Sequence, residues 1–505
     1  MRTKAALKNT ITSILLEIAL AVSGIVLPKF FIAFYGSSVN GLCTSIGQFI
    51  TYMGLVEAGI SAAGTVALYK PLADGDMRDV SGIVSAARSF YIKSGLIFLA
   101  LDILLIIGYP FIVNNEITDM TFIREMIVIL SISGLVDYFF LGKYRVLLVA
   151  DQRSYVIYTA QIIGIVVTVV SSIILIKLEM SALIVKGVVA LVYILRSIAI
   201  IIYAKKHYKG LNVKATPMKS KFSQRYAALF HQIVGMICNN TDIILLTILL
   251  PAGALAEVSV YSVYYLVMYT IYSLVNSISN GLSASFGQIM ASDERDALYS
   301  NFSFYELAMF MLSFIAYSCM AVTMYSFVSL YSAEFTDGVV YTRWILVALF
   351  AATGLMQSIR LPGMTLICVA GHYKQTRGRA ALEAALNLII SIALIFKLGI
   401  VGVIIGTLCS YSYRSIDTII YSGTRFVKGT LSRSFIRLLR NAVVAAGVLV
   451  IGFLMMPQSA SGWMSWVLWT ALYAVITLVA FALVNYIFEP KEFKAVLTKL
   501  KSLRG

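Results

Sequence analysis

The sequence predicts an all-α polytopic membrane protein with about fourteen transmembrane helices. Of its 505 residues, 60% are hydrophobic and only 13% are charged. A soluble domain needs roughly a quarter of its residues charged to keep its surface wet. Apolar runs of about 20 residues, the length that crosses the hydrocarbon core, recur along the whole chain with short polar segments between them. Runs of this length, rather than shorter alternating segments, argue against an outer-membrane barrel.

The predicted spans follow from these runs, and the first lies close to the N-terminus. The run from Ile11 to Phe34 is too long for a cleaved signal peptide and lacks a small-residue cleavage site, so we expect it to remain as a span. The expected spans are 10–34, 41–66, 94–113, 125–142, 154–176, 181–204, 226–250, 257–285, 303–330, 343–370, 380–396, 399–424, 441–456 and 463–488.

The basic residues indicate how these helices are oriented. The chain has 40 Lys and Arg against 24 Asp and Glu, a net charge of +16. When the N-terminus is placed in the cytoplasm, most basic residues fall in inner loops, above all in segment 205–225 and after Pro490. This is the positive-inside pattern, so the surplus faces anionic membrane lipids and does not indicate nucleic-acid binding. We therefore expect both termini on the cytoplasmic side of the cell membrane, with an amphipathic tail along its inner surface.

A short internal repeat predicts the organisation of the chain. The sequence Tyr193-Ile-Leu-Arg-Ser-Ile198 in the sixth span reappears as Tyr411-Ser-Tyr-Arg-Ser-Ile416 in the twelfth. Parallel repeats of six helices place a binding site between two lobes and work by alternating access. The expected parts are the N-lobe 1–204, a basic cytoplasmic linker 205–225, the C-lobe 226–424, and 425–505 with two further helices and the tail.

Three arginines inside the predicted spans are candidates for binding an anion. A charge in the hydrocarbon region costs at least about 2.5 kcal/mol, so each one needs a reason. Arg196 and Arg414 lie deep in their helices and can present bidentate donors to a diphosphate. Snorkelling is the structural alternative, as is pairing with Asp417. Arg360 precedes Pro362, where a broken helix would line a cavity; a structural ion pair is its alternative.

Acidic residues in the spans are candidates for coupling transport to an ion or proton gradient. A desolvated carboxylate can carry a proton or hold a cation. The alternative for each candidate is structural pairing or an interfacial position, and the candidates are Glu17, Glu57, Asp102, Asp137, Asp242 and Glu383. Glu17 and Asp242 rank highest because the first and seventh helices hold equivalent places in the two lobes.

Amide side chains are candidates for contact with a hydroxyl-rich ligand. Asn239 begins the densest polar cluster in any predicted span, and Asn276 and Asn280 lie in a helix that is rich in serine. The alternative is that small residues in these helices only permit close packing.

The sequence contains no motif that predicts an enzyme, a cofactor or a metal site. It has no GxxxxGK[ST] phosphate loop, no HExxH and no GxSxG, and no predicted outer loop is long enough to hold chemistry. The five cysteines fall in apolar segments without a CxxC spacing. We therefore expect a transporter rather than an enzyme.

The segment Gly54-Leu-Val-Glu-Ala-Gly-Ile60, with Leu68-Tyr-Lys-Pro-Leu-Ala-Asp74 and Tyr91-Ile-Lys-Ser-Gly95, is similar to a known family. It resembles the polysaccharide transporter (Wzx-type flippase) family of the multidrug/oligosaccharidyl-lipid/polysaccharide flippase superfamily. The resemblance implies a flippase that moves undecaprenyl-diphosphate-linked oligosaccharide to the outer leaflet for surface polysaccharide biosynthesis. A polysaccharide polymerase and glycosyltransferases are candidate partners. It implies no role for any individual residue.

Two alternatives remain open. A multidrug and toxin extrusion antiporter has a similar twelve-helix core, but it exports organic cations, for which several arginines in a cavity are unfavourable. A non-transporting membrane scaffold for polysaccharide enzymes is the other alternative, and it would leave the deep arginines of both lobes without a purpose.

Overall fold

The computed structural model of the chain describes residues 2–57, 59–113, 116–218, 225–250, 252–291, 295–455 and 462–495. Within these ranges the structure is helical and contains no strand, which confirms the all-α fold class. Residues 219–224 of the predicted linker and residues 496–505 of the predicted amphipathic tail lie outside the described residues.

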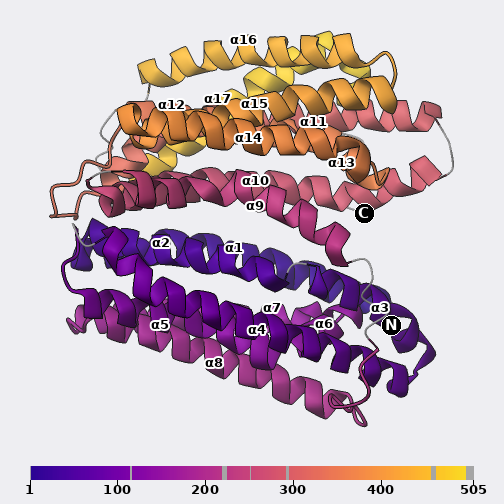
Figure 1. Cartoon of the computed structure of the whole chain (residues 1–505). Helices are drawn as coiled ribbons and strands as arrows, with labels where there is room; N and C mark the ends of the chain where they lie inside the picture. Colours follow the sequence, from indigo (N-terminus) through magenta and orange to yellow (C-terminus); the bar gives the residue numbers. More distant parts are fainter. Residues whose placement is uncertain are drawn as a thin grey trace. The chain divides into compact units, whose positions relative to one another are not determined.

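The chain divides into two compact units, each described here by itself. Unit 1 is Met1–Ser259 with Phe335–Asp337, and unit 2 is Val260–Glu334 with Gly338–Gly505. Helix α9 packs against α2 and belongs to unit 1, whereas the lobe boundaries that we inferred from the repeat stay a prediction. The helices of unit 1, seen in indigo to magenta in Figure 1, are α1 (Arg2–Tyr35), α2 (Ser37–Met53), η1 (Gly54–Glu57), α3 (Ile60–Asp74), α4 (Met77–Val113), α5 (Met120–Val136), η2 (Asp137–Leu141), α6 (Gly142–Ala150), α7 (Ser154–Lys177), α8 (Ala182–His207) and α9 (Arg225–Leu249).

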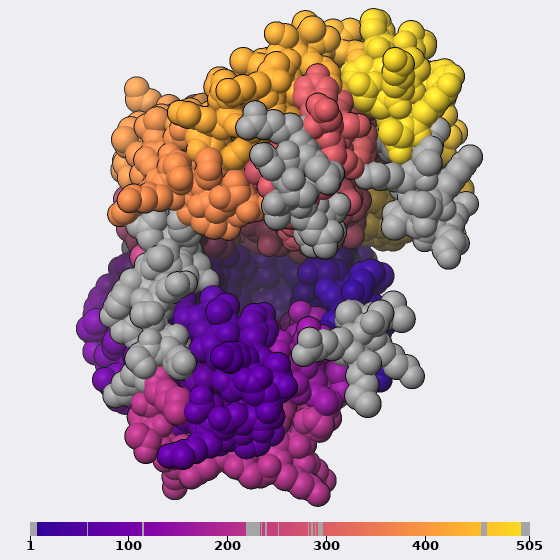
Figure 2. Space-filling model, turned by 90° about the vertical axis from the view of Figure 1, so that its right-hand side faces the viewer, coloured from indigo at the N-terminus to yellow at the C-terminus, as the bar shows by residue number. Residues whose placement is uncertain are grey.

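Unit 2 begins within α10 and ends with the last two long helices. Its helices are α10 (Ala254–Ala291), α11 (Arg295–Tyr331), α12 (Trp344–Ile359), α13 (Leu361–Val369), α14 (Tyr373–Leu398), α15 (Ile400–Arg425), α16 (Leu431–Met455) and α17 (Trp463–Phe488). In Figure 2 the light-orange and yellow atoms of α16 and α17 lie against one another, and both helices pack on α11.

Each of the predicted spans coincides with one helix or with helices separated by a short break. Among the described residues, 11 helices are long and apolar enough to cross a membrane, or up to 12 if the bent pair Ser37–Glu57 and Ile60–Asp74 is one span. Helices α9 and α15 lie where the two other spans were predicted. In α15, polar residues such as Arg414 and Asp417 lower the hydropathy. The chain is therefore a multi-pass membrane protein.

Two of the spans in unit 1 are interrupted by irregular turns. The 3₁₀ turn η1 follows α2, and Gly59 then adopts a φ of 84°, which a residue with a side chain rarely adopts. The π-helical turn η2 separates α5 from α6. The Nζ of Lys143 donates to the carbonyl oxygens of Phe139 (3.4 Å) and Phe140 (3.0 Å), which the widened turn leaves accessible. Such interruptions at membrane depth persist where side chains or a cavity satisfy the backbone.

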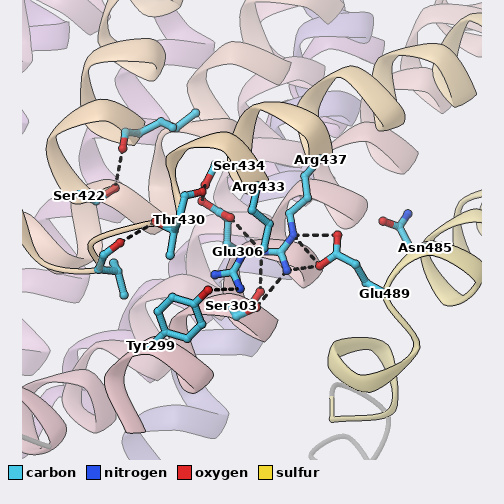
Figure 3. A network of polar contacts seen from close by, with 12 residues as sticks. Tyr299, Ser303, Glu306, Ser422, Thr430, Arg433, Ser434, Arg437, Asn485 and Glu489 are labelled. Carbon is cyan, nitrogen blue, oxygen red and sulfur yellow. Dashed lines mark hydrogen bonds and ion pairs between the residues drawn. The ribbon is translucent and has the colours of Figure 1, made fainter. Parts of the chain in front are cut away.

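A buried arginine joins three helices at one end of unit 2 (Figure 3). Arg437 of α16 is 0% exposed and donates to Glu306 of α11 at 2.9 Å and to Glu489, just beyond α17, at 2.9 and 3.0 Å. The backbone oxygen and the hydroxyl of Ser303 accept further bonds from the same guanidinium group. Arg440 also binds Glu489, at 2.8 Å. We call Arg437, Glu306 and Glu489 the α16 clamp.

Two neighbouring arginines stabilise the ionised form of Glu489, the partly exposed member of this clamp. Burial raises the pKa of Glu489, but the hydrogen bonds and charge of Arg437, followed by those of Arg440, outweigh it and lower that pKa overall. Glu489 therefore remains ionised at neutral pH and holds α17 to α16.

Candidate functional site

Both interrupted helices of unit 1 line one cavity of about 530 Å³. Turn η1 and the residues around it form one part of its wall, and the start of η2 forms another. Helices α4 and α9 complete it. The lining residues are Ile50, Thr51, Gly54, Leu55, Glu57, Gly59, Ser61, Phe98, Ser133, Gly134, Asp137, Tyr138, Gly235, Met236 and Asn240.

The polar groups of this cavity include two carboxylates with one guanidinium group beside them. Glu57 and Asp137 contribute two carboxylates to the wall. Arg145 of α6 lies behind them, with its Nη2 2.5 Å from Oδ2 of Asp137. The hydroxyl of Tyr91 is 3.4 Å from Oε1 of Glu57. One guanidinium group against two carboxylates leaves a surplus of one negative charge when both acids are ionised.

Side chains from neighbouring helices hold the broken backbone beside the cavity. The hydroxyl of Ser94 donates to the carbonyl oxygen of Val56 at 2.9 Å, and the hydroxyl of Tyr138 donates to that of Gly54 at 3.3 Å. The rings of Phe98 and Tyr138 lie 5.1 Å apart, between centroids. These contacts tie the backbone of η1 to α4 and η2 beside the cavity.

Unit 2 contains a second group of charged residues, on α14, α15 and the break between α12 and α13. The guanidinium group of Arg360 lies 2.6 Å from the carboxylate of Glu383. Arg414 lies 3.5 Å from Glu383 and 2.8 Å from Asp417. Asp417 also pairs with Arg379. We call these five residues the arginine cluster, which holds three cations and two anions.

The three arginines of this cluster are not equivalent. The exposed fraction of the side chain is 4% for Arg414, 13% for Arg360 and 42% for Arg379. Arg360 lies over the ring of Tyr411, with 4.7 Å to its centroid, and Arg379 lies over Tyr421 at 5.2 Å. Arg414 is therefore the inner member, engaged by both carboxylates, and the pairing with Asp417 that we left open is present. Arg360 and Arg379 are the outer members.

The third predicted arginine has different surroundings. Arg196 lies on α8 in unit 1, half-buried, with its guanidinium group over the ring of Tyr193 at 4.2 Å. Its side chain also lies against Gly164 of α7. The two copies of the repeated sequence thus place their arginines in unlike environments.

The remaining predicted residues are dispersed over both units. Asn240 lines the cavity together with Glu57, whereas the side chain of Asn239 lies outside the described residues. Asp242 is buried on α9 but does not line the cavity. The others are Glu17, exposed on α1, Asn276, half-buried on α10, and Asn280, exposed on α10.

Asp137 and Glu383 were among the acidic candidates, but their cationic neighbours Arg145 and Arg379 were not among the predicted site residues. Asp137 and Arg145 are eight positions apart, with the irregular turn η2 between them, and their charges meet in an ion pair. Arg379 and Glu383 are four residues apart on α14, a spacing that places two side chains on one helix face. That spacing is visible in the sequence, but Arg379 lies just before the predicted span.

No family model and no curated protein sequence matches the chain. Several solved structures, in contrast, match the chain. The chain is similar to the lipid II flippase MurJ in an inward closed conformation, with a TM-score of 0.66 and 14% identity over 95% of this chain and 98% of that one. It is also similar to an inward-facing multidrug resistance MATE transporter of the MOP superfamily, with a TM-score of 0.63 and 11% identity over 84% and 99% of the two chains. A MATE structure in a bent conformation gives 0.54 and 12%, over 88% and 97%. The chain therefore has the fold of these membrane proteins.

Proposed function

We propose that this chain is a flippase that moves undecaprenyl-diphosphate-linked oligosaccharide across the cytoplasmic membrane by alternating access, for surface polysaccharide biosynthesis. The observation that carries the proposal is the surplus positive charge of the arginine cluster, which lies on α14, α15 and the break between α12 and α13. Three guanidinium groups share two carboxylates, and two of them, Arg360 and Arg414, lie within predicted spans, where a charge costs at least about 2.5 kcal/mol. A diphosphate offsets this cost, because guanidinium groups bind phosphate oxygens in pairs.

Within the cluster, we assign the contact with the diphosphate to the outer arginines. Arg414 is engaged by Glu383 and Asp417, and in our proposal it positions these two carboxylates. Arg360 and Arg379 each retain an accessible part of their side chain. The fold supports this function, because the match with the lipid II flippase extends over more of the chain than the match with the inward-facing multidrug transporter.

Loss of either outer arginine is expected to slow flipping at least about tenfold, since a hydrogen bond to a charged group contributes about 1.5–3 kcal/mol. The measurement is the transfer of fluorescent undecaprenyl-diphosphate-linked oligosaccharide between leaflets in vesicles with purified Arg360→Gln or Arg379→Gln protein. Lys374→Gln is the matched control, because Lys374 is an exposed cation on the same helix, α14. Wild-type protein that leaves the lipid in its original leaflet would refute the proposed function.

We further propose that Glu57 couples transport to a proton or cation gradient. Its carboxylate faces the cavity of unit 1, whereas Arg145 pairs with the neighbouring Asp137. Glu57→Gln is expected to leave flipping insensitive to an ionophore that collapses the gradient, while flipping by the wild type slows. Glu125→Gln, at an exposed position on α5, serves as the control. Equal ionophore sensitivity of Glu57→Gln and wild type would remove Glu57 from this role.

One observation favours a second candidate, an antiporter for organic cations. The cavity of unit 1 carries a net negative charge when Glu57 and Asp137 are both ionised, and this charge attracts a cation. The same vesicles distinguish the two candidates, because an antiporter would move ethidium against its gradient and leave the lipid-linked oligosaccharide in place. A scaffold would move neither compound.

A further inference from the structure

The size of the cavity in unit 1 indicates an organic ligand. Its volume is about 530 Å³, within the range of roughly 300–1,000 Å³ that small-molecule sites occupy. A bound metal ion or proton requires only a few ligand atoms close around it. Among the described residues, no group of three or more His, Cys, Asp and Glu could hold a metal ion. The opening is therefore larger than coupling to an ion alone requires.

The chemistry of the wall indicates what kind of ligand fits. Hydroxyl groups come from Thr51, Ser61 and Ser133, an amide from Asn240, and carboxylates from Glu57 and Asp137. These groups offer both donors and acceptors, as a ring with several hydroxyl groups requires. Phe98 and Tyr138 supply ring surface on which the apolar side of such a ligand can pack.

The charge of the cavity wall further restricts the class of ligand that can bind. Arg145 balances one of the two carboxylates, so the cavity retains a negative charge when Glu57 and Asp137 are both ionised. Another carboxylate brought within about 4 Å of it would be repelled by about 4 kcal/mol at a protein-like effective dielectric constant. A neutral or amine-bearing ligand meets no such repulsion.

We propose that this cavity binds a sugar residue of the transported oligosaccharide and selects neutral or amino sugars over carboxylated ones. The inference rests on the proposed function, since it takes the sugar to be part of the flipped headgroup. Asn240 and Asp137 bind the ring hydroxyl groups or the amine. Glu57 faces the same space, so its protonation state and the occupancy of the cavity by sugar influence each other.

The test uses the purified full-length protein and soluble sugars, without any lipid. Calorimetric titration with a methyl hexoside, a hexosamine and a hexuronate is expected to show saturable binding of one or both of the first two and at least tenfold weaker binding of the hexuronate. Asn240→Ala is expected to weaken binding about five- to tenfold, the effect of one lost hydrogen bond. Gln161→Ala, on α7 and outside the cavity lining, should bind like the wild type.

Asp137→Asn provides an independent comparison, because it removes the negative charge next to Arg145 and should reduce the discrimination against hexuronate. Binding of the hexuronate equal to that of the neutral sugar would refute the selectivity. Saturable binding of ethidium or of sodium ions alone, without any sugar, would refute the sugar site. Flipping of lipid-linked oligosaccharide by a protein that binds no soluble sugar would refute this inference and leave the proposed function intact.

Discussion

Replacement of Arg437 by methionine is expected to lower the free energy of unfolding by about 3–5 kcal/mol, the usual cost of breaking a buried ion pair by removing one partner. Arg437 is completely buried and is the cation that pairs with Glu306, at 2.9 Å. Without it, the Glu306 carboxylate stays in the interior with the hydroxyl of Ser434 as a hydrogen-bond donor, at 2.7 Å, and with the charge of Arg433 nearby. Glu489 keeps a cationic partner, because Arg440 still lies 2.8 Å away.

Thermal melting of the purified protein in detergent measures this effect. Arg425→Met is the control, since Arg425 is an exposed cation at the end of α15. The double variant Arg437→Met with Glu306→Gln is expected to recover part of the lost stability, because it removes the unpaired buried charge. A melting temperature of Arg437→Met equal to that of Arg425→Met would show that the α16 clamp contributes nothing to stability.

The helices of this protein could be predicted from the sequence because they depend on a local property. A helix that faces lipid must satisfy its own backbone and be apolar along its length, so hydropathy alone marks it. The limits of that rule appear in α15, where Arg414 and Asp417 lower the hydropathy. The neighbouring helices α12 and α14 explain how the membrane tolerates α15, since Arg360 and Glu383 come from these segments and complete the cluster.

The candidate site could be predicted only in part, because its charges are matched by residues distant in the sequence. Arg360 and Arg414 were recognisable as costly residues in predicted spans, but Glu383, which joins them, could be placed only by the fold. In unit 1, Glu57 and Asn240 were candidates for separate reasons, and the structure brings them to one cavity. The interruption at η2, which turns Asp137 toward Arg145, has no clear sequence signal, since Asp137-Tyr-Phe-Phe-Leu contains neither proline nor glycine.

Among the described glycines, Gly41 of α2 is the one whose replacement by alanine is expected to lower the stability of the protein most. A Cβ atom at Gly41 would lie 1.8 Å from the carbonyl oxygen of Leu255 and 2.5 Å from its carbonyl carbon, far inside contact distance. The start of α10 cannot easily retreat, because the carboxylate of Glu116 accepts the backbone N–H of Leu255 at 3.1 Å. The neighbouring bond from Asn40 to Ser259, 2.8 Å long, would be strained by the same displacement.

Gly41→Ala is therefore expected to lower the free energy of unfolding by about 3 kcal/mol or more, at the upper end of overpacking effects. Gly47→Ala is the matched control on the same helix, because a Cβ atom there meets nothing within 4 Å. Alanine loses less backbone entropy than glycine when the helix forms, so that variant should be more stable by roughly 0.5–1 kcal/mol. Thermal melting should thus shift in opposite directions for two substitutions that add the same methyl group to one helix. Equal shifts would mean that α2 does not approach the backbone of Leu255 closely, and the contact between α2 and the start of α10 would have to be abandoned.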